Sequence, residues 1–162
     1  MAHAKLINEV TDLVWLLRGF DTDLKKKVFN EILSEWKTID SIVEKFGDEG
    51  IEALSYFEKI KLVETRWAMP EDEKPKKEYR ANYNSFHIRI VSSIDKISDA
   101  FAVARLDDKE FSEIEKKIYD WIGTGKMGRE VEIQYHLSPV KLKAIVKRSD
   151  RLVYKGMMIE KI

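Results

Sequence analysis

The fold is decided by Thr38-Ile-Asp-Ser-Ile-Val-Glu-Lys-Phe-Gly-Asp-Glu-Gly-Ile-Glu-Ala-Leu-Ser-Tyr-Phe57. Apolar residues recur every three to four positions on both sides of Gly47-Asp48, which predicts two helices joined by a tight turn. Thr38 can cap the first of these helices. Strand-forming residues follow at 63–67 and 79–83, on either side of a charged loop bounded by two prolines. With a helix predicted before Thr38, the order is three helices and then a β-hairpin.

This order is repeated about 90 residues later in the chain. Ser138-Pro139 is a strong helix start, because serine caps helices and proline is favoured at the first helical position. Helices over 114–122 and 129–137 precede it, and Lys155-Gly156 predicts a hairpin turn after it. Three helices and a β-hairpin form the winged helix-turn-helix, which presents one helix to a DNA groove. We expect a mainly α protein with small β-hairpin wings (α+β) and a second helix-turn-helix unit at the C-terminus.

Four segments are expected along the chain. The apolar run from Leu6 to Leu17 predicts an N-terminal helix that packs on the body of the protein or on a second subunit. Asp21-Thr22 can cap the first helix of the winged unit, and Ser92-Ser93 can cap a connecting helix that follows a strand over 85–91. The segments are an N-terminal packing or dimerisation helix in 1–20, the winged helix-turn-helix in 21–84, a connecting strand and helix in 85–106, and the second helix-turn-helix with its hairpin in 107–162.

Composition excludes several classes of protein. Hydrophobic residues make up 44% and charged residues 36% of the chain, which is typical of a globular protein. No apolar run approaches the ~20 residues of a membrane-spanning helix, and the start of the chain lacks a signal peptide, so we expect a cytoplasmic protein. The chain has no cysteine, which excludes disulfides, thiolate metal ligands and cysteine nucleophiles.

Charge is distributed unevenly along a chain whose formal net charge is zero. Residues 123–162 carry nine Lys and Arg against four acids, a net charge of +5. Such asymmetry favours contact between that end of the chain and a polyanion. A capped helix that presents cations from one side suits phosphate neutralisation. The DNA-contacting candidates of this half are Lys126, Arg129, Ser138, Lys141, Lys143, Lys147, Arg148, Arg151 and Lys155.

The N-terminal unit leaves two interpretations open. Its third helix carries Glu49, Glu52 and Glu58, and carboxylates near phosphates weaken DNA binding, although glutamate can accept a hydrogen bond from cytosine. Either this unit contacts DNA mainly through its wing, or it is a protein-contact module. Its DNA-contacting candidates are Ser55 and Tyr56 on the helix and Lys74, Lys76, Lys77 and Arg80 on the wing.

Nothing in the sequence predicts an enzyme, a cofactor or a metal site. Gly123 to Gly128 matches G-x-G-x-x-G, but a helix precedes it and no βαβ unit surrounds it, so a loop is the better interpretation. His3, His87 and His136 are scattered without the paired ligands of a metal site. The four tryptophans (15, 36, 67 and 121) lie at spacings typical of a core.

The stretch Thr11-Asp-Leu-Val-Trp-Leu-Leu-Arg-Gly-Phe-Asp21, together with Gly50-Ile-Glu-Ala-Leu54, Leu62-Val-Glu-Thr-Arg-Trp67 and Ser149-Asp150-Arg151, resembles archaeal transcriptional regulators of the ArsR type. The resemblance spans nearly the whole chain and implies a dimeric, winged-helix DNA-binding regulator. Metal-sensing members carry a cysteine pair in the helix before the recognition helix, where this chain has 39–46 without cysteine. A second metal site of that family uses Asp and His on the last helix, and the 107–122 helix contains no histidine. Metal sensing is therefore not carried over.

We expect a homodimer joined by the N-terminal helix, by the helix over 94–104, or by both, which binds double-stranded DNA and answers to an effector that the sequence does not identify. The alternative is a tandem winged-helix protein-interaction module of a transcription or chromosome complex. Its support is the neutral total charge and the acidic third helix of the first unit.

Overall fold

The computed structural model describes residues 3–71 and 74–162 and divides the chain into two compact units. Unit 1 comprises Met1–Leu6 and Gly19–Ile88, and unit 2 comprises Ile7–Arg18 and Arg89–Ile162. The described residues form eight helices and eight short strands, which makes this a mixed α and β protein with small sheets.

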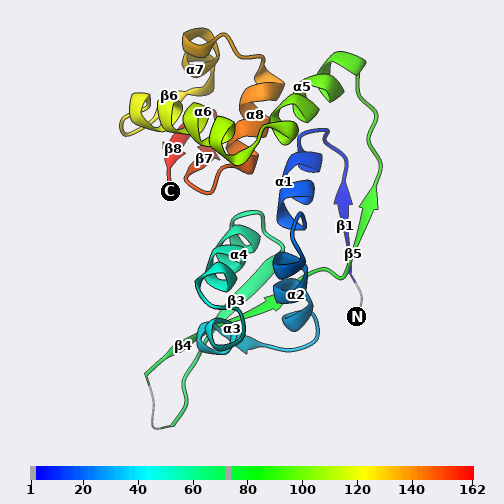
Figure 1. Ribbon diagram of the computed structural model, residues 1–162, viewed down its shortest axis with the longest axis vertical. Helices are drawn as coiled ribbons and strands as arrows, with labels where there is room; N and C mark the ends of the chain where they lie inside the picture. Colours follow the sequence, from blue (N-terminus) through cyan, green and yellow to red (C-terminus); the bar gives the residue numbers. More distant parts are fainter. Residues whose placement is uncertain (1–2, 72–73) are drawn as a thin grey trace. The chain divides into compact units, whose positions relative to one another are not determined.

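Unit 1 begins its main body with a helix that Thr22 caps by accepting a hydrogen bond from the Lys25 backbone N–H, as the sequence predicts. Thr38 caps α3 in the same way. The strands β2, β4 and β3 form an antiparallel sheet in that order (Figure 1). Strands β1 (Ala4–Ile7) and β5 (Ser85–Ile88) form a separate two-stranded sheet. The elements of the main body are α2 (Asp23–Glu31), β2 (Lys37–Thr38), α3 (Ile39–Phe46), α4 (Asp48–Lys59), β3 (Val63–Ala68) and β4 (Lys76–Ala81).

Aromatic rings hold the core of unit 1 together. Phe29 and Phe57 meet edge to face with their ring centroids 5.2 Å apart, and Phe20 stacks on Phe57 at 5.7 Å. Such ring pairs add to the gain from burial. Ile42 and Leu54 are fully buried beside them and join α3 to α4.

The turn between α3 and α4 depends on two glycines. Gly47 has φ +68°, a left-handed conformation that residues with a side chain rarely adopt. Gly50 lies in the first turn of α4, where a Cβ would come within 2.8 Å of Ile42 Cγ2 and 3.0 Å of Phe46 Cβ. The two helices therefore approach as closely as they do because position 50 has no side chain.

Unit 2 repeats the order helix, strand, helix, helix, strand, strand within its last 55 residues, Asp108–Ile162. Its sheet order, β6-β8-β7, matches the order β2-β4-β3 of unit 1. Ser138 caps α8 as predicted, Asp107 caps α6, and the hairpin turn forms at Lys155-Gly156. The elements of unit 2 are α1 (Asp12–Gly19, whose last residue falls in unit 1), α5 (Ile94–Arg105), α6 (Asp108–Trp121), β6 (Lys126–Met127), α7 (Gly128–Tyr135), α8 (Pro139–Arg148), β7 (Leu152–Lys155) and β8 (Met158–Lys161).

The apolar run at the N-terminus is not one helix, so this prediction was wrong in part. Leu6 and Ile7 end strand β1, and α1 starts only at Asp12. The Arg89 backbone N–H donates to Ile7 O at 2.9 Å, so strand pairing competes successfully with the helix at this point. The apolar residues of the helical part still find a core, because Val10 and Val14 are buried among residues of α5, α6 and α8.

The wing also differs in detail from the expectation. Its second strand starts at Lys76 and not at Tyr79, and β2 adds a third strand to the sheet. Residues 72–73 of the expected charged loop lie outside the described residues. Among the residues that are described, no helix has the length and apolar character needed to cross a membrane.

Replacing Gly50 with alanine should lower the free energy of unfolding by about 1 to 3 kcal/mol, because the added methyl group overlaps Ile42 and Phe46. Gly19→Ala is the matched control. A Cβ at position 19 would meet its neighbours at 3.6–3.8 Å, an ordinary contact, so we expect a change within about 0.5 kcal/mol. Urea denaturation followed by circular dichroism measures both, and equal losses for the two variants would contradict the close approach.

Candidate nucleic-acid interface

The third helix of unit 1, α4, has one open face. Asp48, Glu49, Glu52 and Ser55 are exposed, and their spacing of three to four residues places them along one side of the helix. The opposite side buries Ala53, Leu54, Tyr56 and Phe57. Within unit 1 the helix packs against α2 and α3. A helix that packs against its own unit with one side can insert its exposed side into a groove of DNA.

The third helix of unit 2, α8, has no comparable face. Only Pro139 at its start is exposed, while five of its ten residues are buried. Figure 1 shows α8 between α5 and the helices α6 and α7, and α8 packs against both α5 and α7. The helix that the sequence favours for DNA contact is therefore packed by helices of its unit, although the side chains of Lys141 and Lys143 are 40% and 45% exposed.

The lysines of α8 are paired with carboxylates of the same unit. Lys143 Nζ lies 2.6 Å from Glu9 Oε2, and Lys147 bridges Glu9 and Asp12. Lys141 Nζ lies 3.8 Å from Asp99. A DNA phosphate would have to displace these carboxylates before it could bind the lysines.

Ser138 and Arg148 are also engaged inside unit 2. The Ser138 hydroxyl donates to Asp99 Oδ2 at 2.6 Å while its oxygen accepts from the Lys141 backbone N–H. Arg148 is only 5% exposed, and its guanidinium donates to the carbonyl oxygens of Val103 and Leu106, both at 2.8 Å. The charged group of Arg148, a predicted phosphate contact, is thus buried and hydrogen-bonded inside unit 2.

Arg151 belongs to a second internal network. Its guanidinium donates twice to Glu115 Oε2, at 2.7 and 3.2 Å, and the hydrogen bond to Glu115 raises the pKa of Arg151. The buried Ser149 hydroxyl donates to the same carboxylate and accepts from the backbone N–H groups of Arg151 and Leu152. This network ties α6 to the start of β7, so Ser149 and Arg151 are structural.

The other basic candidates of unit 2 lie on its surface. Arg129 and Lys155 are exposed, and their nearest carboxylates are Glu132 at 3.7 Å and Glu160 at 2.7 Å. The ammonium group of Lys126 lies 5.3 Å from the centroid of the Trp121 ring. Exposed ion pairs of this kind contribute little stability, and phosphates can replace them.

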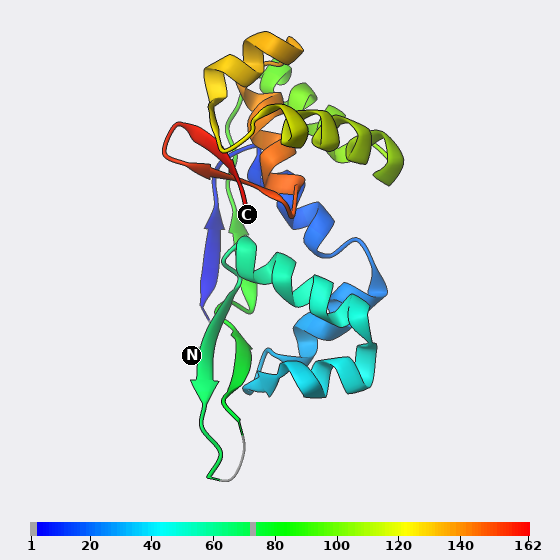
Figure 2. The ribbon, with the colours of Figure 1, turned by 90° about the vertical axis from the view of Figure 1, so that its left-hand side faces the viewer.

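The wing of unit 1, defined here as β3, β4 and the described residues 69–71 and 74–75 next to them, extends past the helices of its unit (Figure 2). Lys74 is exposed, and Lys76 lies 3.7 Å from Asp40 of α3. Lys77 donates to both carboxylate oxygens of Glu58, at 2.8 and 2.9 Å. Burial opposes the charge on Lys77, but the hydrogen bonds to Glu58 prevail and raise its pKa. Lys77 therefore holds the wing to α4.

Two aromatic residues of unit 1 differ in exposure from what their sequence positions predict. Tyr56, a predicted DNA contact, is only 8% exposed and packs in the core, whereas Ser55 beside it is exposed. Trp67 was assigned to the core but is 66% exposed, and Met69 is exposed after it. Trp67 lies on the same face of the sheet as Val63 and Thr65. It is exposed because its position, paired with Lys77, lies in the part of the wing that extends beyond the core. In the sequence, the charged loop that follows Trp67 was the only indication that this residue lies outside the core.

The opposite face of the wing sheet carries a stacked cluster. Trp36 lies between two guanidinium groups, with Arg66 Cζ at 4.2 Å and Arg80 Cζ at 4.8 Å from its ring centroid. Arg66 pairs across the strands with Glu78 and Arg80 with Glu64. The cluster stiffens the base of the wing, and Arg80 is engaged there and not on the outer surface of the wing.

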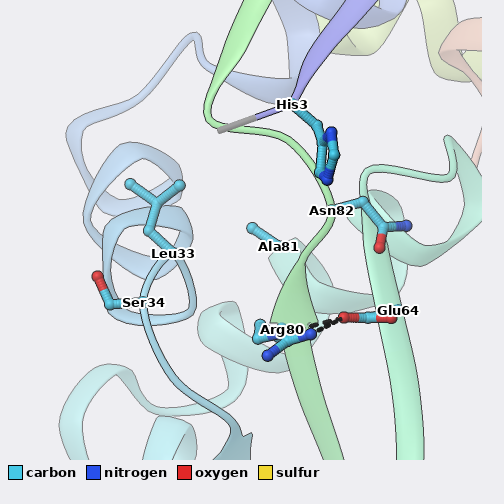
Figure 3. Close-up of a pocket in the computed structure, with 7 residues that line it drawn as sticks. All are labelled: His3, Leu33, Ser34, Glu64, Arg80, Ala81 and Asn82. Carbon is cyan, nitrogen blue, oxygen red and sulfur yellow. Dashed lines mark hydrogen bonds and ion pairs between the residues drawn. The ribbon is translucent and has the colours of Figure 1, made fainter. Parts of the chain in front are cut away.

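A cavity of about 470 Å³ opens beside this cluster, within unit 1. Figure 3 shows Leu33 and Ser34 on one side of it, His3 and Asn82 on the other, and Arg80 with Glu64 at its base. Its size lies in the range of small-molecule sites in proteins. Elsewhere in the described residues, no three or more His, Asp or Glu side chains come together as a metal site would require.

The pairing of Glu9 with α8 makes stability depend on pH. The hydrogen bond that Lys143 donates, opposed by burial, lowers the pKa of Glu9. The ionised Glu9 carboxylate contributes its stability fully above the pKa that glutamate has in the unfolded chain, about 4.3. This stability is lost as the pH falls through the lower pKa that Glu9 has in the folded protein. The urea midpoint of Glu9→Gln should therefore lie below that of the wild type at pH 7, and the difference should shrink below about pH 4.

Glu113→Gln, on the exposed side of α6, is the control for this measurement and should leave the midpoint unchanged at both pH values. A Glu9→Gln effect of the same size at pH 7 and pH 3 would show that the Glu9 charge does not carry the contribution.

The chain was compared with models of known protein families, with curated proteins and with solved structures. A family model described as ArsR transcriptional regulator matches residues 7–162, nearly the whole chain. No curated protein and no solved structure gave a significant match.

Proposed function

Because the chain belongs to the ArsR family of transcriptional regulators, we propose that unit 1 is a winged helix-turn-helix that binds double-stranded DNA through α4 and the wing. The protein is thus a transcriptional regulator. The observation that carries the proposal is the open face of α4, which α8 lacks. A groove admits a helix only where the helix presents a free side.

The order of elements supports this assignment. Unit 1 has the three helices and the three-stranded sheet of a winged helix, with β3 and β4 as the wing. Unit 2 has the same order, and we propose that it is a second helix-turn-helix unit whose third helix now serves as a core element. Its buried residues, among them Leu142 and Ile145, pack in the core of unit 2.

Two kinds of contact follow for unit 1. Ser55, on the open face of α4, is the residue that we assign to base edges, and Glu52 can accept a hydrogen bond from a cytosine amine. Lys74, which is exposed, and Lys76, whose Nζ lies 3.7 Å from Asp40, are assigned to phosphates because both belong to the wing. The carboxylates of α4 oppose non-specific binding, since they repel the phosphates of any duplex that does not offer matching donors.

Removing the two wing lysines tests this assignment. Lys74→Ala with Lys76→Ala should weaken DNA binding and reduce the slope of log K against log salt by about one unit for each lost phosphate contact. The matched control is Lys143→Ala with Lys147→Ala, which removes the same charge from α8 and should leave the slope unchanged, because Glu9 and Asp12 already neutralise these lysines.

Fluorescence anisotropy with a duplex from the promoter of the protein's own gene, a scrambled duplex and several salt concentrations measures both pairs. A slope that falls for the α8 variant and not for the wing variant would assign DNA to unit 2. Absence of any salt-sensitive binding would contradict the proposed function as a whole.

A homodimer is the second part of the proposal. Val91 is 91% and Ile94 is 84% exposed, and Phe101 is exposed two turns further along α5. Apolar side chains of this size form a patch that water solvates poorly. Asp95 and Arg105 lie near opposite ends of the same helix, so two copies of α5 packed antiparallel about a two-fold axis would bring acid to base at each end. The partner that fits this face is a second copy of the chain.

Ile94→Lys should shift the protein from dimer to monomer in sedimentation equilibrium, because it places a charge in the apolar interface. Ile133→Lys is the control, since Ile133 is also an exposed isoleucine but lies on α7. A wild-type monomer at concentrations of about 100 μM, or a dimer that survives Ile94→Lys, would contradict the α5 interface.

A further inference from the structure

The cavity beside the Trp36 cluster is built from four separate parts of unit 1. His3 comes from the segment before β1, Ser34 from the loop after α2, Glu64 from β3, and Arg80 with Asn82 from the end of β4. The Ala81 backbone N–H donates to Ile32 O at 2.8 Å and the Asn82 backbone N–H donates to Leu62 O at 2.9 Å. These bonds hold the walls together, so the cavity is formed without a ligand.

Polar groups that have no other partner converge on this cavity. In the described part of the chain, the side chains of His3, Ser34 and Asn82 make no hydrogen bond or ion pair. Arg80 uses Nε and Nη2 on one oxygen of Glu64, at 2.9 and 2.7 Å, which leaves its Nη1 group available. His3 and Ser34 are open to solvent, so a polar ligand would replace water at these groups, and a cavity lined by such groups is a candidate binding site.

Hydrogen-bond donors and acceptors both line this cavity, since the Ser34 hydroxyl oxygen and the Asn82 amide oxygen can also accept. Arg80 Nη1 and the Asn82 amide donate, the Ser34 hydroxyl can donate, and the imidazole of His3 carries one N–H or two. The Glu64 carboxylate is the main acceptor, and it already accepts from Arg80. The ligand that satisfies such a set carries oxygen acceptors, and an arginine with a planar fork of donors favours carboxylate or phosphate.

We propose that this cavity binds a small anionic metabolite, one with a carboxylate or phosphate group, and that it is the effector site of the regulator. The proposal for binding stands on the cavity alone, whereas the effector role rests on the proposed function of unit 1. A bound anion would join Arg80 at the base of the wing to Ser34 in the loop after α2. It would thereby change the position or stiffness of the wing, which is the part assigned to phosphates of DNA.

Binding can be measured without DNA. The full chain is titrated with inorganic phosphate and, separately, with malonate, at an ionic strength held constant with sodium chloride, and the side-chain signals of Asn82 and Arg80 are followed by NMR. We expect saturable shifts of these signals for one of the two anions, with a Kd on the order of 1 mM or tighter. The anion that saturates identifies the phosphate or the carboxylate class. Shifts that chloride reproduces, or none at all, overturn the proposal.

Arg80→Gln and Arg66→Gln form a matched pair of variants. Both arginines stack on Trp36 and both pair with a glutamate across the strands, but only Arg80 lines the cavity. Arg80→Gln should weaken anion binding roughly tenfold or more, since it removes a charged donor, while Arg66→Gln should change it by less than about twofold. Equal losses in the two variants would assign the effect to the stability of the wing and overturn the site. Asn82→Ala, which removes an unpaired side chain, should give a loss without any effect on folding.

Coupling to DNA is read separately by anisotropy with the promoter duplex. A saturating concentration of the anion should change the DNA affinity of the wild type beyond the chloride control and leave that of Arg80→Gln unchanged. Anion binding without such a change overturns the effector role. A loss of DNA affinity in Arg80→Gln with no anion present would place Arg80 at the DNA backbone. This result would also overturn the effector role. If the protein binds anion but no DNA under any condition, the proposed function fails and the binding site stands.

Discussion

The buried guanidinium of Arg148 is the interaction on which the organisation of unit 2 depends. A charge removed from water is stable only where hydrogen bonds replace the lost solvation. The carbonyl oxygens of Val103 and Leu106 supply them at the end of α5, Asp108 adds a carboxylate at the start of α6, and the Phe111 ring lies 4.2 Å from the guanidinium carbon. Two helices, α5 and α6, are thus fixed to the end of α8, and α8 cannot be exposed without leaving this charge unpaired.

The same order of elements consequently serves two purposes in one chain. In unit 1 one side of the third helix packs against α2 and α3, and the other side leaves Glu52 and Ser55 exposed to solvent. In unit 2 the additional helices α1 and α5 cover the third helix, and the carboxylates of Glu9, Asp12 and Asp99 neutralise its lysines. A net positive charge in the C-terminal segment therefore does not amount to a positive surface on its third helix. Whether a helix can bind DNA is decided by what covers it.

The wing sheet separates its tasks by face, because successive residues of a strand point to opposite sides. One face carries Trp36 with Arg66 and Arg80, a stacked cluster that stiffens the strands and borders the cavity. The other carries Tyr79 into the core and then Trp67 into solvent beyond it. A ligand in the cavity and a duplex at the wing would act on the same two strands from different sides.

The sequence by itself determined the local structure: the caps at Thr22, Thr38, Asp107 and Ser138, the turn at Gly47 and the repeated order of helices and strands all follow from short-range signals. These features can be predicted from the sequence because caps and turns depend on residues a few positions apart. The family was also recognisable from short motifs. Only the tertiary structure decided which third helix is open, where Arg148 and Trp67 lie, and that a cavity forms at Arg80. Each depends on partners far along the chain, as Lys143 does on Glu9, and no local pattern records such distant contacts.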